Sequence, residues 1–133
     1  MKNIKKYRNF LESKKNKFPN IKKEVFNDFI IYVGKDAKSN DHLTFNVAEN
    51  DDLWFHTKGE PGSHVVIRVK DRLPTDEVIK YAASLAKKNS KAKNKNIAEV
   101  VYCKVKFVKK AKNMNPGQVK VDYTNSYTIK INN

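Results

Sequence analysis

The stretch over residues 51–68 constrains the fold most, because it joins two strand-like runs through a turn rich in glycine and proline. Aromatic and β-branched residues predict strands over residues 53–58 and 63–69. The segment between them holds residues that shape tight turns, namely Gly59, Pro61 and Gly62. The sequence therefore predicts a β-hairpin.

The register of this hairpin is open between two alternatives. Side chains alternate along a strand, so Trp54 and His56 share one face. A plain four-residue loop would place them beside Val65 and Ile67, which are apolar. A bulge in the turn would place them beside His64 instead, on the same face as Arg68. We favour the second register, because it builds one aromatic, histidine and basic surface.

Further strands are predicted from apolar and alternating runs at residues 29–33, 100–110, 119–123 and 127–131. Residues 34–41 form a polar connection in this interpretation. Residues 43–48 are ambiguous: Asn40 or Asp41 could cap a helical turn there, yet Leu43, Phe45 and Val47 alternate as in a strand. Residues 91–96 are expected to form a Lys/Asn loop without apolar anchors.

Helices are predicted in two places. Pro74 precedes Thr75, a good N-cap, and Val78 and Ala82 then begin an apolar stripe at helical spacing. Residues 5–17 read as a short basic amphipathic helix. The predicted fold is therefore a single α+β domain, a mostly antiparallel sheet with one central helix packed on it and a basic N-terminal helix. The boundaries are a basic segment at 1–24 and the domain at 25–133.

The net charge of +14 favours a polyanionic partner such as RNA, DNA or an anionic membrane. The charge is uneven: residues 1–24 hold nine Lys/Arg and two acids, residues 87–112 hold ten and one, and residues 25–86 hold seven and ten. The excess positive charge thus lies outside the hairpin. With a single cysteine, no long apolar run and no signal-peptide pattern, the chain is expected to be cytoplasmic and not bound to a membrane.

The hairpin residues also carry a family resemblance. The string D-L-W-F-H-T-K-x-x-P-G-S-H-V-V-I over residues 52–67 resembles the central signature of the NFACT-R domain of RqcH- and NEMF-like ribosome quality-control proteins. Residues 33–41, V-G-K-D-A-K-S-N-D, are similar to the family's V-G-R-N-x-x-x-N-D element, with Lys35 and Asp36 in place of Arg-Asn. Residues 108–110 and 115–119 resemble its V-K-K and K-P-G-x-V elements.

This resemblance implies a stand-alone RNA-binding module linked to translation or ribosome-associated quality control, with rRNA or tRNA, and through them the large ribosomal subunit, as partners. The larger family proteins carry further domains that this sequence lacks, so only the RNA-binding part carries over. No cofactor is expected, and the oligomeric state is open. Two alternatives remain: a histidine-dependent RNA-processing or phosphoesterase enzyme, and a surface adhesin of the fibronectin-binding type.

The predicted RNA-binding residues combine one stacking aromatic, two histidines and the basic side chains that contact phosphates. They are Trp54, His56, Lys58, His64, Arg68, Lys35, Lys87, Lys88, Lys91, Lys104, Lys106, Lys109 and Lys110. Phe55 is assigned to the core instead. His56 and His64 could share a metal ion across the hairpin, but no third ligand has a clear spacing, so no metal site is predicted. No catalytic residue is predicted either.

Overall fold

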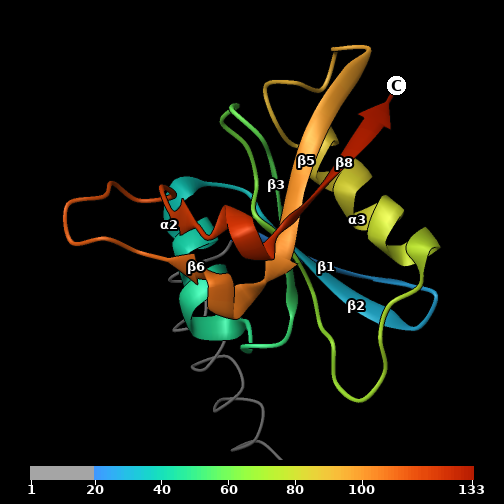
Figure 1. Cartoon of the computed structure of the whole chain (residues 1–133), viewed down its shortest axis with the longest axis horizontal. Helices are drawn as coiled ribbons and strands as arrows, with labels where there is room; N and C mark the ends of the chain where they lie inside the picture. Colours follow the sequence, from blue (N-terminus) through green and yellow to red (C-terminus); the bar gives the residue numbers. More distant parts are fainter. Residues whose placement is uncertain (1–19) are drawn as a thin grey trace, which may run out of the picture.

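A six-stranded antiparallel sheet organises the computed structural model, which describes residues 20–133 (Figure 1). The order across the sheet is β1-β2-β4-β3-β5-β8. The strands are β1 (Ile21–Phe26), β2 (Phe29–Gly34), β4 (Val65–Ile67), β3 (Leu53–Thr57), β5 (Ile97–Lys104) and β8 (Tyr127–Asn132). This sheet, with helices on it, confirms the α+β class. The predicted N-terminal helix lies outside the described residues.

The hairpin formed by β3 and β4 has the register that we favoured. Trp54 is paired with Val66 and Phe55 with Val65, so His56 and His64 project to the same face as Trp54. The ring centroids of Trp54 and His64 lie 5.2 Å apart. The register arises from a wide loop over residues 58–64, not from a bulge within the ladder.

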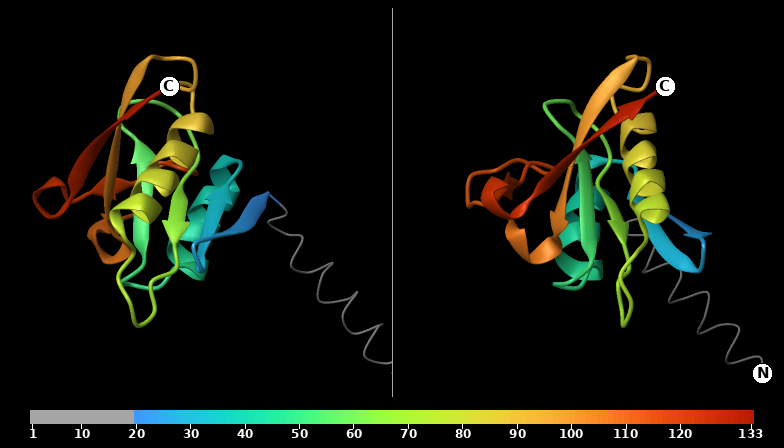
Figure 2. Two further views of the ribbon diagram at one scale, coloured as in Figure 1. Left: turned by 90° about the vertical axis from the view of Figure 1, so that its right-hand side faces the viewer. Right: turned by 45° about the vertical axis from the view of Figure 1, so that its right-hand side comes forward.

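One face of the sheet is covered by α3 (Asp76–Lys88) (Figure 2). Thr75 caps this helix as predicted, because its Oγ1 accepts a hydrogen bond from Val78 N at 3.4 Å. Its buried stripe packs on Phe55 and the inward side chains of the neighbouring strands. The core position predicted for Phe55 is confirmed, since the side chain is fully buried.

The opposite face carries a second apolar cluster around Trp54. It is covered by helix α2 (Ala37–His42), the π-helical turn η1 (Leu43–Val47) and a small sheet of β6 (Val108–Lys109) and β7 (Lys120–Val121). Figure 2 shows α3 and these smaller elements on opposite sides of the central strands. Because both faces are covered, both alternating sets of side chains are buried or half-buried in β3 and in the middle of β5, over residues 100–103.

Three segments differ from the sequence-based expectation. Residues 34–41 are not only a polar connection: Asp36 caps α2 by accepting a hydrogen bond from Ser39 N at 2.8 Å. The ambiguous segment after it is the π-helical turn η1, not a strand. The Lys/Asn loop over residues 91–96 does have an apolar anchor, because Ala92 is 1% exposed.

The predicted strand over residues 100–110 is also interrupted. β5 ends at Lys104, and the 3₁₀ turn η2 (Val105–Phe107) redirects the chain into β6. The break is held by Val105 N, which donates to Asp52 O at 2.9 Å. Val108, which alternation along one continuous strand would place on the same face as Lys104 and Lys106, is therefore buried. The predicted strand at 119–123 is reduced to the two residues of β7, and the 3₁₀ turn η3 (Tyr123–Asn125) follows.

The first strand was not predicted and crosses the expected domain boundary after residue 24. It pairs with β2 from Ile21↔Gly34 to Phe26↔Phe29. The turn between them uses Asn27 and Asp28, which both have positive φ. No helix within residues 20–133 is long and apolar enough to cross a membrane.

Candidate nucleic-acid interface

A pocket of about 860 Å³ lies between the β3–β4 loop and the segment from Met114 to Tyr123. It gathers eight of the residues that the sequence analysis singled out for binding or for the turn: Lys35, Trp54, His56, Lys58, Gly59, Pro61, Gly62 and His64. These residues come from β3, the loop after it and the loop after β2, so the fold brings the hairpin and the V-G-K-D element together.

Trp54 and His64 are not presented for contact, although both border this pocket. Trp54 is 0% exposed and His64 is 1% exposed. Base stacking needs an accessible ring face, so the burial of Trp54 argues against the stacking role predicted for it. The indole Nε1 of Trp54 has no hydrogen-bond partner among the described residues.

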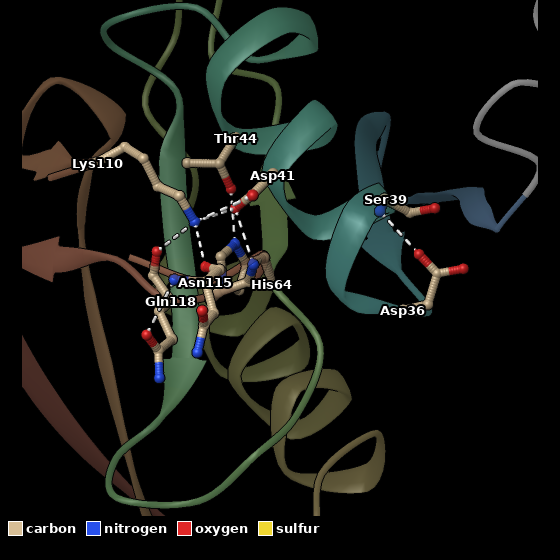
Figure 3. Close-up of polar contacts among 9 residues, drawn as sticks. Asp36, Ser39, Asp41, Thr44, His64, Lys110, Asn115 and Gln118 are labelled. Carbon is tan, nitrogen blue, oxygen red and sulfur yellow. Dashed lines mark hydrogen bonds and ion pairs between the residues drawn. The ribbon is translucent and has the colours of Figure 1, made fainter. Parts of the chain in front are cut away.

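His64 connects two segments that cover this face of the sheet (Figure 3). Its Nε2–H donates to Gly117 O at 3.1 Å, and its Nδ1 accepts from Thr44 Oγ1 at 2.8 Å. Burial, with nearby His56 as a second cause, lowers the pKa of His64 to about 3. The ring is therefore neutral at physiological pH, and both of its nitrogens are engaged, so it is poorly suited to proton transfer or metal binding.

His56 is partly buried, and its ring centroid lies 5.5 Å from that of His64. Burial lowers its pKa, partly offset by hydrogen bonding to the backbone of Ser63 and Glu60. Across residues 20–133, no group of three or more His, Cys, Asp or Glu side chains is placed to hold a metal ion.

Asn40 fixes the loop that carries His64. Its Oδ1 accepts a hydrogen bond from His64 N at 3.0 Å, and its Nδ2 donates to Gly62 O at 3.4 Å. A Cβ on Gly34 would lie 2.0 Å from the same Oδ1, so glycine is needed there. Sequence reasoning considered Asn40 only as a cap and did not predict this role.

Lys110 organises the loop over residues 111–118 instead of lying open to phosphate. Its Nζ lies 3.0 Å from Asp41 Oδ2 and donates to Asn115 O at 2.5 Å and Gln118 O at 2.8 Å (Figure 3). Asp41 also accepts a hydrogen bond from Gly117 N at 3.0 Å. This network docks the loop on α2 and joins Asp41 to Gly117.

Two further basic residues of the predicted set have structural roles. Arg68 Nε lies 3.0 Å from Oδ2 of Asp52, which is fully buried. The guanidinium NH2 of Arg68 also donates to Val47 O at 2.9 Å. Lys87 is 3% exposed and donates to Lys93 O at 3.1 Å and to Asn133 Oδ1. Neither side chain is available for phosphate contact in this structure.

Five further lysines of the predicted set lie toward the two ends of β5. Lys88 and Lys91 are exposed near the end of α3, before β5 begins. Lys104, Lys106 and Lys109 are exposed at and beyond the other end of β5, whose eight residues span about 26 Å. Lys104 and Lys106 both approach Asp51, at 3.7 and 3.8 Å. Lys88 and Lys91 therefore lie apart from Lys104, Lys106 and Lys109.

Tyr123 borders the pocket and was missed by sequence reasoning, which placed it at the end of a strand. It is 60% exposed, and the Nζ of Lys58 lies 5.8 Å from its ring centroid. Lys35 is exposed on the other side of the pocket and donates to Asn89 Oδ1 at 2.5 Å. The accessible aromatic and basic groups of the pocket are thus at its rim, while Trp54 and His64 form its buried wall.

Comparisons with known proteins agree with the motifs. A family model described as "NFACT protein RNA binding domain" matches residues 17–123. The chain is 46% identical over 92 residues to the Rqc2 homolog RqcH of Bacillus subtilis (strain 168), covering 69% of this chain and 16% of that protein. It is 44% identical over 103 residues to the Rqc2 homolog RqcH of Streptococcus suis (strain 05ZYH33), covering 77% of this chain and 18% of that protein.

A solved structure shows the same fold. The C-terminal part of the fibronectin/fibrinogen-binding protein from Streptococcus suis matches with a TM-score of 0.77 and 38% sequence identity, over 85% of this chain and 45% of that one. The chain spans less than a fifth of the length of the two curated relatives. Because the family model covers residues 17–123 and the two relatives are 46% and 44% identical over 69% and 77% of this chain, the chain belongs to the family of NFACT protein RNA binding domains.

Proposed function

We propose that this chain binds RNA in the cytoplasm and acts in ribosome-associated quality control, with rRNA or tRNA as its ligand. The observation that carries the proposal is its membership of a family of RNA binding domains over residues 17–123. The net charge of +14 supports this role. Each RNA phosphate that a lysine neutralises releases bound counterions, and this release favours binding.

The structure supplies exposed cations for this purpose but reduces the predicted set. Lys35, Lys58, Lys88, Lys91, Lys104, Lys106 and Lys109 are exposed and remain in the proposed interface. Arg68, Lys87 and Lys110 are engaged internally, and Trp54 and His64 are buried. His56, partly buried beside the rim, is retained as a residue that supports the pocket wall.

The test is a titration of labelled tRNA and of a large-subunit rRNA fragment at increasing salt concentrations. We expect the logarithm of the binding constant to fall linearly with the logarithm of the salt concentration. Lys58→Glu should weaken binding, whereas Lys80→Glu, which makes the same charge change on an exposed position of α3, should have a smaller effect. Affinity that does not respond to salt would contradict binding through phosphates.

An enzymatic role is less well supported by the geometry. Two histidines acting as acid and base would each need an available ring nitrogen, but His64 Nδ1 and Nε2 are already paired with Thr44 and Gly117. We expect labelled tRNA to remain intact on incubation with the protein. Cleavage that disappears in His56→Ala would favour the enzyme instead.

The adhesin alternative has one observation in its favour, which is that the structurally similar streptococcal protein is named for fibronectin and fibrinogen binding. Cell fractionation separates the two roles. Recovery with ribosomal particles supports the proposal, whereas recovery on the cell surface supports the adhesin. Crosslinking the protein to RNA in its own cells and sequencing that RNA would identify the ligand.

A further inference from the structure

Tyr123 lies where two hollows of the surface meet. The pocket described above and a smaller hollow of about 480 Å³ share Val121 and Tyr123 in their linings. The smaller hollow is also lined by lysines from three elements: Lys106 of η2, Lys109 of β6 and Lys120 of β7. Together with Lys35 and Lys58 of the larger pocket, these residues form a continuous band, which we call the lysine–tyrosine track: Lys35, Lys58, Tyr123, Lys106, Lys109 and Lys120.

The backbone that carries Tyr123 is held in place by local hydrogen bonds. Asp122 N donates to Phe107 O at 3.0 Å, which ties the turn to the end of η2. The carboxylate of Asp122 accepts from Thr124 N at 3.1 Å and from Asn125 Nδ2 at 2.7 Å. These bonds fix the 3₁₀ turn, so the exposed ring of Tyr123 projects from a rigid support and not from a loose loop.

The acidic groups on the track are satisfied by other partners. Glu60 is paired with Lys95, Asp36 accepts from Ser39 N and from Asn20 Nδ2, and Asp122 accepts within its own turn. Lys106 lies 3.8 Å from Asp51, a long and exposed pair that costs little to open. Five lysines therefore outnumber the three carboxylates that line the two hollows, and Asp51 beside Lys106 is a fourth. The lysines of the pair β6–β7 are adjacent, since Lys109 is in register with Lys120.

We propose that the lysine–tyrosine track binds single-stranded RNA, with one unpaired base stacked on Tyr123 and the neighbouring phosphates held by the lysines. The inference rests on the proposed RNA binding and specifies its site and the form of RNA. An exposed aromatic ring beside a basic groove is the arrangement by which proteins hold single strands, because every base has a face that can stack. A duplex offers phosphates to the lysines but keeps its bases stacked inside, so Tyr123 adds affinity only for a single strand.

The experiment compares a labelled oligoadenylate of about ten nucleotides with a duplex RNA of equal length, by fluorescence anisotropy at one salt concentration. Tyr123→Ala should weaken single-strand binding about tenfold and leave duplex binding unchanged. Tyr123→Phe keeps the ring and should retain the affinity. Tyr127→Ala is the matched control: Tyr127 is also exposed, at 67%, but it pairs with Tyr102 on the α3 face of the sheet.

The emission of Trp54 gives a second readout, because it is the only tryptophan of the chain and borders the larger pocket. A change in emission on adding oligoadenylate, reduced in Tyr123→Ala, supports occupation of the track. Single-strand affinity that is equal in Tyr123→Ala and the unmodified chain overturns this inference alone. Binding of a poly-glutamate peptide as tight as that of RNA also overturns it, and absence of binding to any RNA overturns the proposed function with it.

Discussion

His64 occupies a position in the family-like signature that invites a chemical role, yet its environment gives it a structural one. It is buried against Trp54 and has one partner on the turn after α2 and one on the loop over residues 111–118. A charged imidazolium would lose the hydrogen bond that Nδ1 accepts and would be placed in an apolar environment. Its function is to connect two covering segments to β4 while remaining neutral.

The stability of the fold should therefore depend on pH through His64. The pKa of this histidine is about 3 in the folded chain and near 6.5 in the unfolded chain, so the unfolded chain binds the extra proton between these values. The stabilisation is complete above pH 6.5 and is lost as the pH falls toward 3. At pH 5 we expect a loss of about 2 kcal/mol relative to pH 7.5, measured by urea denaturation.

The control for this prediction is His64→Phe, which keeps an aromatic ring but cannot titrate. At pH 7.5 it should be less stable than the unmodified chain by about 2 kcal/mol, because Thr44 Oγ1 and Gly117 O lose their partner. This difference should shrink toward pH 5, where the unmodified chain has lost its histidine contribution. A difference that is constant with pH would show that the pKa of His64 is the same in the folded and unfolded chains.

At the scale of elements, the β3–β4 loop is joined to the end of α3 by backbone contacts. Ser63 N donates to Asn89 O at 3.0 Å, and Lys91 N donates to Pro61 O at 2.9 Å. Gly62 lies between them, and a Cβ there would be 2.5 Å from Ser90 Cβ and 2.8 Å from its Cα. The pocket wall that this loop forms is therefore positioned by the helix behind it, and this requires a residue without a side chain.

We expect Gly62→Ala to destabilise the chain by about 2 kcal/mol, because Ser90, which follows α3, and the loop would have to separate. Gly59→Ala is the comparison in the same loop: Gly59 has φ +74 but no atom within 4 Å of an added Cβ, so it should cost only about 1 kcal/mol of backbone strain. Thermal and urea denaturation of both variants measure the difference. Equal effects would mean that the loop moves away from Ser90 without cost.

At the scale of the whole molecule, both faces of the sheet are buried under separate layers. Cys103 lies beneath the layer opposite α3, so its reactivity can be used to measure the opening of that layer. Its side chain is 1% exposed within the cluster that contains Trp54. Burial raises the pKa of the Cys103 thiol to about 11, with the nearby charge of Asp122 as a second cause. The thiolate is therefore both scarce and inaccessible in the folded chain.

The reaction of Cys103 with an aromatic disulfide reagent should require opening of this layer. Cys103 is the only cysteine of the chain, so the absorbance change has a single origin. We expect slow labelling in buffer at pH 8 and a rate that increases with urea in proportion to the unfolded population. Fast labelling of the folded chain would indicate that the β6–β7 layer opens independently of the rest.

Much of the architecture follows from local sequence patterns. The hairpin, the helix after Thr75 and the last strand are local, so the residues themselves specify them, whereas alternation alone left the hairpin register open between two alternatives. The motifs also identified the family, and they singled out the pocket that Lys35, Lys58 and the glycine-rich loop border. The helix α2 was missed because its polar residues lack an apolar periodicity. The break after Lys104 was missed because it depends on a hydrogen bond to Asp52, which is distant in sequence.

What the sequence determined by itself is the list of strand-forming runs, the turn chemistry and the excess of positive charge, because these depend on residue type and spacing. What only the tertiary structure decided is which of those side chains reach the surface. Trp54 and His64 are covered by segments that lie far from them in sequence, Arg68 and Lys110 find carboxylates on other elements, and Tyr123 is left exposed at a turn. Exposure depends on how separate elements pack against one another, and no local pattern encodes that.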